Sequence, residues 1–237
     1  MKQFIFIVLM MLASTNIFSQ NNSIGIRSGV SISTIASKHF LSNNSPRIGI
    51  VEGISYDYFF KKHFIGGEVN YEQRGFKNYI IFTDYNGNPT GRREPVYFQF
   101  DYLTFPVKLD YRFGNKFFAF AGIGILPAYV IKANTILPVF DQNFVVIREE
   151  KISTLNSVSK FDLGGLAEIG GGFTVREKFS INISFRYQRS FTSISNNQYF
   201  PSTEIRHISM QPSIGIKYSF PNKGNYQPTI GNQKKRS

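Results

Sequence analysis

The sequence predicts an all-β protein: an eight-stranded antiparallel transmembrane β-barrel, an up-and-down meander with short periplasmic turns and long outer loops. The first observation is an alternation of apolar and polar residues with a period of two, which gives a strand one apolar face. The second is that no stretch after residue 20 is continuous enough to be a transmembrane helix. The third is the aromatic content of 16%, because outer-membrane barrels carry aromatic girdles at both lipid–water boundaries.

The first four expected strands carry apolar residues at alternate positions. Isoleucines dominate the outward face of the first strand, and isoleucines and tyrosines dominate that of the second. In the third and fourth strands the outward apolar residues alternate with charged ones. Glu52 is the misfit on the outward face of the second strand, and a β-bulge could turn it inward. The expected ranges are Ile24–Thr34, Arg47–Phe60, Phe64–Phe76 and Val96–Phe113.

The last four expected strands include one whose register is open. The fifth is apolar at odd and even positions, so its pattern does not decide which residues face outward. The others alternate clearly: in the eighth, Ile214 and Ile216 face one side, and Ser213 and Lys217 face the other. With no helix to cover them, the apolar faces are expected to meet lipid. The expected ranges are Phe117–Lys132, Phe161–Val175, Phe179–Phe191 and His207–Phe220.

The connections between these strands alternate in length. Short turns facing the periplasm and long loops facing outward are typical of outer-membrane barrels, and an even strand number leaves both termini on the short-turn side. The short connections are Lys61–His63, Gly114–Lys116 and Arg176–Lys178, and the long ones are about Ile35–Pro46, Lys77–Pro95, Ala133–Lys160 and Thr192–Arg206.

Both ends of the chain are expected to lie outside the barrel. Lys2 supplies a positive charge, Phe4 to Ala13 is an apolar run, and Ser19 is a small residue before a cleavage point, as in a secretory signal peptide. The C-terminal residues contain scattered prolines and glycines and end in basic residues. The expected organisation is a cleaved signal peptide at 1–20, an outer-membrane β-barrel at 21–220 and a flexible basic tail at 221–237.

Composition limits the chemistry and indicates the surroundings. The chain has no Cys, which excludes disulfides, thiol catalysis and thiolate metal sites. Its net charge of +12 is spread along a chain that is expected to be exported, so we interpret it as a surface for anionic lipid headgroups rather than for nucleic acid. The expected partners are outer-membrane lipid and lipopolysaccharide, with envelope or secretion-complex proteins as further candidates.

The expected interior of the barrel is polar and charged. Eight strands enclose a space that side chains can fill. Buried charges must be paired and hydrogen-bonded, so a plug of salt bridges is the first interpretation. A narrow solute path or a small ligand cavity is the alternative. The inward-facing charged residues are Arg27, Glu68, Glu72, Arg74, Lys108, Asp110, Asp162, Glu168, Arg186 and Lys217.

No catalytic, cofactor or metal site is predicted. Glu68 and Glu72 lie four residues apart on one strand, roughly 13 Å, which exceeds the carboxylate separations of glycosidases. The three histidines, His39, His63 and His207, have no catalytic or zinc-binding motif around them, so we interpret them as turn, girdle or solvated-loop residues. The sequence therefore predicts a non-enzymatic protein without a cofactor.

One acidic segment resembles the start of a calcium-binding loop. Asp84-Tyr85-Asn86-Gly87-Asn88 has suitable oxygen donors, but Pro95 stands where such a loop needs its twelfth-position Glu. We therefore interpret the segment as a tight Asn-Gly turn within an outer loop.

Several motifs together resemble a known family. They are Ile24–Ser31, Tyr102–Tyr111, Phe120–Gly124, and Phe161–Gly164 leading to Gly170–Phe173. Over Ser23–Phe220 the chain resembles the PorT-like outer-membrane β-barrel family common in Bacteroidota. The resemblance implies an outer-membrane location, and its name-giving member is linked to protein secretion and gliding machinery. The chain departs from the usual pattern by continuing past Phe220, since barrels commonly end on a terminal aromatic residue.

Three hypotheses for the function follow. The first is an integral outer-membrane protein with a structural, adhesive or envelope/secretion-accessory role. The second is a small pore or solute transporter. The third is a soluble periplasmic lipocalin-like carrier, in which the alternation is inverted and the apolar residues point inward.

Overall fold

The computed structural model describes residues 22–37, 44–175, 178–195 and 204–220. It is an antiparallel β structure, as predicted, with one short 3-10 turn at Leu155–Ser157. In the described part of the chain, no helix is long and apolar enough to cross a membrane. The predicted signal peptide, tail and His39 lie outside these residues. The strands are β1 Asn22–Ser37, β2 Ser45–Phe60, β3 His63–Thr83, β4 Pro89–Thr104, β5 Val107–Gly114, β6 Phe117–Phe140, β7 Val146–Ser153, β8 Phe161–Val175, β9 Phe179–Ser190 and β10 Ile205–Ser219.

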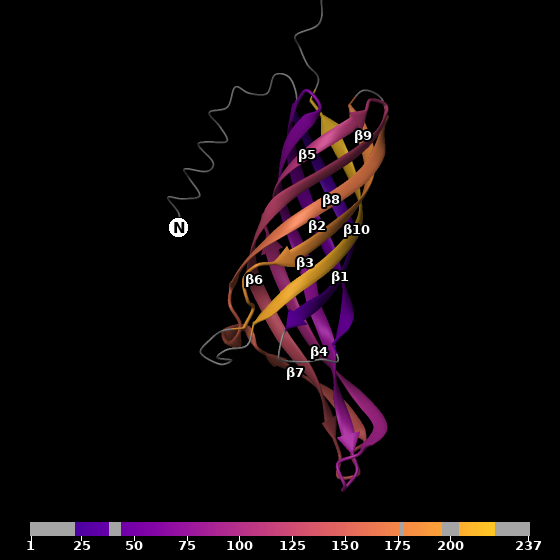
Figure 1. Ribbon diagram of the computed structural model, residues 1–237, viewed down its shortest axis with the longest axis vertical. Coiled ribbons are helices and arrows are strands. Elements are labelled where there is room, and N and C mark those ends of the chain that lie inside the picture. The colour runs from indigo at the N-terminus through magenta and orange to yellow at the C-terminus, as the bar shows by residue number, and fades with distance from the viewer. Residues whose placement is uncertain (1–21, 38–43, 176–177, 196–203, 221–237) are drawn as a thin grey trace, which may run out of the picture.

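The strand pairings run around a closed ring (Figure 1). Strands β1, β2 and β3 pair in order, β3 pairs with both β4 and β5, and both of these pair with β6. From β6 the ring continues through β8 and β9 to β10, which pairs with β1. The ten strands therefore occupy eight positions around the barrel, because β4 and β5 share one position and β7 lies outside the ring.

A proline divides the predicted fourth strand into β4 and β5. Pro106 has no N–H and cannot complete a ladder of hydrogen bonds. The backbone pairing continues on both sides of it: the Phe105 amide donates to Pro127 O at 2.8 Å, and the Glu68 amide donates to Pro106 O at 2.9 Å. The prediction of one unbroken strand over Val96–Phe113 is therefore wrong at this point, although the barrel position is filled as expected.

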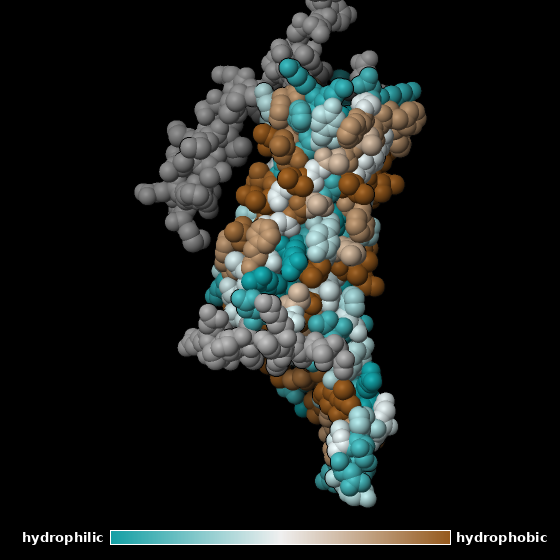
Figure 2. Space-filling model, viewed as in Figure 1, coloured by the Kyte–Doolittle hydropathy of each residue, from teal (hydrophilic) through white to brown (hydrophobic). Residues whose placement is uncertain are grey.

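The barrel is apolar outside, as the alternation predicted. Ile214, Ile216, Phe105 and Val107 are 54, 48, 40 and 49% exposed. Figure 2 shows hydrophobic side chains over the visible face of the barrel wall. Because these side chains point away from the axis, the inverted arrangement expected of a soluble lipocalin-like carrier is wrong.

The register of β6, left open by its sequence, is set by glycines on its inner face. Ile123 and Ile125 face outward, while Phe120 and Leu126 are buried. The inner position of Gly122 lies against Asp110, whose Oδ1 would be only 2.1 Å from a Cβ added there. A larger residue would therefore collide with this buried carboxylate.

Two segments predicted as long loops are instead extensions of the strands. Lys77–Thr83 continues β3 and pairs with β4, and β6 continues to Phe140 and pairs with β7. Runs such as Ile80–Phe82 and Ile136–Phe140 are rich in residues that favour strands. These segments, 78–96 and 134–153, form a narrow sheet that we call the arm. It projects from the long-loop end along the barrel's long axis (Figure 1).

Glu52 and His63 are two residues whose positions the sequence predicts individually. The β2–β3 register does shift between Pro46 and Val51, yet Glu52 stays exposed on the outer face, between its partners Ser28 and Tyr71. The prediction that a bulge turns Glu52 inward is therefore wrong, because the shift precedes it in the strand. His63 lies beside the short β2–β3 turn, as predicted, and packs against aromatic rings.

Candidate functional site

The lumen of the barrel is the first candidate site, since it gathers the charged residues that the alternation pointed inward. Side chains occupy it in three layers. A small pocket lies at the short-turn end, two ionic clusters fill the middle, and an apolar plug crosses the long-loop end.

Glu68 is the centre of the first ionic cluster. It accepts two hydrogen bonds from the guanidinium of Arg186, at 2.7 and 2.9 Å, and one from Arg27 at 3.1 Å. The ammonium of Lys108 lies 3.2 Å from its Oε1. These cations come from β1, β5 and β9, so one carboxylate on β3 ties together strands from around the barrel.

Glu168 and Asp110 complete this cluster. Glu168 accepts from Arg186 at 2.9 Å and also pairs with Lys108. Asp110 lies further away, with its Oδ2 3.6 Å from the Lys108 ammonium. Three cations therefore face three carboxylates, and all six side chains are buried. Such pairing offsets the large cost of removing charges from water.

Arg74 is the centre of the second ionic cluster. Its guanidinium donates to Glu72 at 2.7 and 2.9 Å, to Asp162 at 3.2 Å and to Gln188 at 3.1 Å. It also lies over the ring of Tyr102, 4.7 Å from the centroid. This cluster has two carboxylates and one guanidinium. Hydroxyl groups supply further hydrogen bonds to the carboxylates, since Ser190 and Thr192 both donate to Asp162.

Lys217 is the one predicted interior residue that joins neither cluster. It pairs with Asp57 near the short-turn end, and Ser23 donates to the same carboxylate at 3.2 Å. Asp57 was not among the predicted interior residues. The alternation along the strand does indicate that Asp57 points inward, because it lies between the outward-facing Tyr56 and Tyr58.

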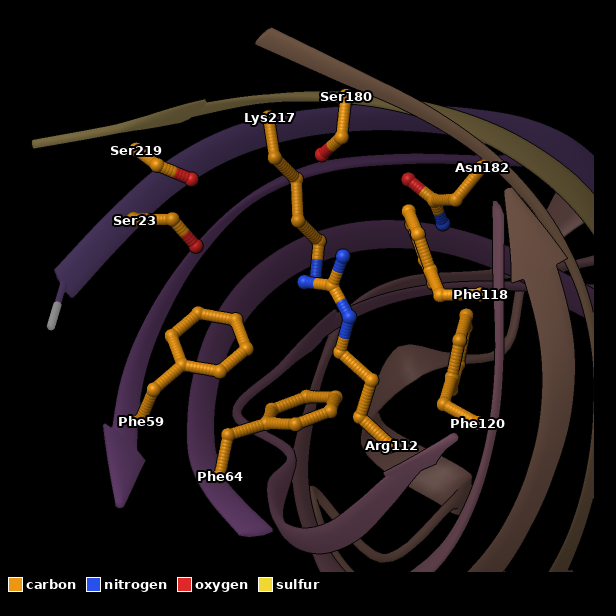
Figure 3. Close-up of a pocket in the computed structure, with 10 residues that line it drawn as sticks. All are labelled: Ser23, Phe59, Phe64, Arg112, Phe118, Phe120, Ser180, Asn182, Lys217 and Ser219. Carbon is orange, nitrogen blue, oxygen red and sulfur yellow. The ribbon is translucent and has the colours of Figure 1, made fainter. Parts of the chain in front are cut away.

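The pocket at the short-turn end is small and partly aromatic (Figure 3). The Arg112 guanidinium enters it and lies 3.9 Å from the centroid of the Phe118 ring. The free volume is about 20 Å³, enough for roughly one water molecule. Its lining residues are Ser23, Phe59, Phe64, Arg112, Phe118, Phe120, Ser180, Asn182, Lys217 and Ser219.

An apolar plug, which the sequence did not predict, crosses the other end of the lumen. Its members come from β1, β3, β4, β6 and the segments flanking the β9–β10 connection, so they approach the axis from several directions. His207 packs edge-on against the rings of Phe100 and Tyr102, at 5.2 and 5.7 Å. The prediction of a girdle or solvated-loop role for His207 is therefore wrong, because its odd position in β10 points inward. The plug residues are Ile35, Phe76, Phe100, Tyr102, Ala128, Val130, Ala133, Ile194 and Ile205.

The arm is the second candidate site, and its two tips share one turn geometry. Asp84 Oδ1 accepts from the amides of Asn86 and Asn88, and Asp141 Oδ1 accepts from those of Asn143 and Val145. The first tip is the tight Asn-Gly turn that the sequence predicted. The hydrogen bonds from the backbone amides of Asn88 and Asn86 hold the pKa of Asp84 below its usual value.

A left-handed residue completes each turn. In the first tip it is Gly87 at φ +83°, which costs little. In the second it is Phe144 at φ +60°, a conformation that bulky residues rarely adopt. Phe144 packs against Phe82 of the other hairpin, with their ring centroids 6.2 Å apart, and its carbonyl accepts a hydrogen bond from Arg92. The two tips of the arm therefore contact and stabilise one another.

The described side chains offer no grouping for metal chemistry: within these ranges, no three or more His, Asp or Glu residues gather to hold a metal ion. The buried carboxylates are each engaged with cations or hydroxyls inside the barrel wall. What this arrangement can do chemically is hold the strands together and close the lumen.

Comparison with known proteins gives a family and a set of similar folds. The family model described as "Outer membrane protein beta-barrel domain" matches residues 18–196. Among curated proteins, none is similar in sequence.

Three solved structures are similar at low sequence identity. Neisserial surface protein A (NspA) is 13% identical, covering 85% of this chain and 100% of that chain with a TM-score of 0.47. OprG from Pseudomonas aeruginosa is 14% identical, covering 85% and 97% with a TM-score of 0.44. Ail, the attachment invasion locus protein of Yersinia pestis, is 13% identical, covering 84% and 99% with a TM-score of 0.39.

Proposed function

We propose a role for this chain from one premise: it belongs to the outer membrane protein beta-barrel domain family, and it is an outer-membrane protein. Its role in that membrane is non-enzymatic. The barrel is a closed anchor that does not conduct solutes, and it holds the arm outside the cell for a structural or adhesive purpose.

The filled lumen is the observation that carries this proposal. A solute path would have to pass two clusters of mutually paired charges and then an apolar plug that includes Phe76, Phe100 and Tyr102. Opening that path would leave buried charges without partners, at a cost of several kcal/mol for each broken pair. This argues against the alternative of a small pore or transporter.

Membrane lipid and lipopolysaccharide are the partners that best fit the outer surface. The apolar wall suits hydrocarbon, and Lys132, Lys160 and Arg189 are exposed toward the long-loop end. Cations at that level can pair with anionic headgroups, each contributing on the order of 1 kcal/mol. Envelope or secretion-complex proteins would then meet the arm rather than the wall.

A closer relation to the PorT-like barrels is part of the proposal. It is supported by the strand motifs around Tyr102–Tyr111 and the glycines of Phe120–Gly124, where Gly122 makes room for Asp110. An accessory role in an envelope complex would be the specific form of the function.

Conductance across a planar lipid bilayer tests the closed lumen. The purified protein should first show heat-modifiable migration on a gel, which establishes that the barrel is folded. Folded protein inserted in the bilayer is then expected to give no stable current steps. Reproducible steps from folded wild-type protein would contradict the proposal and favour the pore.

A further inference from the structure

Strand β7 presents an unpaired edge on the arm. It pairs with β6 on one side and with no other strand among the described residues. Its residues from Ile147 to Ser153 are all exposed, including Ile147 at 61% and Ile152 at 43%. An exposed edge strand is a template for another strand, and proteins usually protect it with charges. Here the charges are Arg148, Glu149, Glu150 and Lys151.

The backbone of β7 determines which residues can bond to an added strand. The Thr154 amide donates to Ala133 O at 2.9 Å, and the same register pairs Thr135 with Ile152 and Val139 with Arg148. Because antiparallel hydrogen bonding alternates along a strand, the even-numbered residues from Arg148 to Ile152 bond to β6, whereas Val146 lies beyond a register shift. The odd-numbered amides and carbonyls therefore point to the free edge, so an added antiparallel strand must bond there.

The charge pattern of β7 is complementary to itself in one such register. If Glu149 pairs with Glu149 of a second copy, Arg148 of each copy lies opposite Glu150 of the other. On the other face, the two Glu149 carboxylates meet, with Lys151 of the opposite copy as a diagonal neighbour. No ion pair within the described part of this chain engages these four charged side chains.

Directly opposed pairs of this kind are what stabilise antiparallel strands. Opposite charges and apolar partners across a ladder are favourable, and like charges directly opposed are unfavourable. The pairing is isologous, so the contact between Arg148 and Glu150 occurs twice. The charges on β7 therefore disfavour pairing with most other strands. They favour a strand that places a base opposite each acid, and β7 of a second copy does this when it runs antiparallel.

We infer that the arm is a homophilic adhesion site, at which β7 pairs edge to edge and antiparallel with β7 of a second copy in an opposing membrane. This inference rests on the proposed function, since it needs the arm to stand outside the cell. Two copies in one membrane point their arms the same way, so their β7 strands run in the same sense. Copies in facing membranes run in opposite senses, as the antiparallel ladder requires.

Vesicle clustering with charge-swapped variants tests the inference. Full-length protein is placed in phosphatidylcholine vesicles, and light scattering reports clustering. Wild-type vesicles are expected to cluster. Arg148→Glu vesicles and Glu150→Arg vesicles are each expected to stay dispersed, because like charges then oppose one another. Mixing these two variants should restore clustering, since each acid again faces a base.

A matched mixture controls for general charge attraction between vesicles. Glu204→Arg changes the net charge as Glu150→Arg does, but at an exposed position outside β7, so it creates no new pair in the β7 ladder. Mixed with Arg148→Glu vesicles, it is expected to remain dispersed. Clustering of this mixture to the level of the rescued pair would overturn the inference, as would dispersed wild-type vesicles. A wild-type barrel that is folded and non-conducting but leaves vesicles dispersed would overturn the inference alone and leave the proposed function standing.

Discussion

Arg186 shows how one side chain sets the properties of the barrel interior. It is completely buried on β9, yet it holds Glu68 of β3 and Glu168 of β8 within hydrogen-bond distance. Removing one partner of a buried ion pair costs more than the pair itself contributes, because the remaining charge stays buried without compensation. Arg189, on the same strand, points outward and has no such partner among the described residues.

Replacing Arg186 by Met is therefore expected to lower the free energy of unfolding by about 3–5 kcal/mol. The measurement is urea unfolding in detergent micelles, followed by circular dichroism and by heat-modifiable gel migration. Arg189→Met is the matched control and should change the free energy by less than about 0.5 kcal/mol. Equal effects of the two substitutions would show that the ionic cluster does not stabilise the barrel.

At the level of the strands, alternation was informative only where a strand separates two different surroundings. Over most of the barrel, each strand has one face toward lipid and one toward a polar lumen, so the predicted ranges largely hold and β8 has the predicted bounds. The arm lies beyond the barrel and has no such division. Its segments Ile80–Phe82 and Ile136–Phe140 are continuous apolar runs without alternation, so a period of two does not identify them as strands.

The charged interior of the barrel was likewise predictable only from the alternation along each strand. Parity alone pointed the charged residues inward, but the partner of each depends on strand tilt and register, which one sequence does not reveal. Arg74, for example, pairs with Glu72 on its own strand and with Asp162 far along the chain. The apolar plug was missed because residues such as Phe100 and Val130 resemble lipid-facing ones in sequence.

Single-cysteine labelling tests the direction in which the arm points. The chain has no native Cys, so Tyr85→Cys at an arm tip and Lys61→Cys in a short turn each introduce one thiol. Both positions are exposed. A membrane-impermeant maleimide added to intact cells is expected to label Tyr85→Cys, and to label Lys61→Cys only after the outer membrane is permeabilised. The reverse pattern would place the arm in the periplasm.

The whole molecule combines a hydrocarbon-facing wall with a lumen closed by ion pairs and an apolar plug. Each feature needs the other: the apolar wall fixes the register of every strand, and that register brings the charges together inside. A barrel closed in this way can serve as a rigid mount, and the arm is its only large projection among the described residues. The proposed adhesive role follows from this arrangement, in which the barrel anchors the protein in the membrane and the arm is free to contact a partner.

The assignment to the membrane depends on which face of the barrel wall meets hydrocarbon. Quenching of tryptophan fluorescence by brominated lipid measures this directly. The chain contains no Trp, so one can be introduced on each face of β6. Ile123 is 68% exposed on the outer face, and Phe120 is buried on the inner face. Because the outer face meets hydrocarbon, we expect strong quenching of Ile123→Trp by brominated acyl chains and little quenching of Phe120→Trp. Strong quenching of Phe120→Trp with none of Ile123→Trp would contradict the assignment to the membrane.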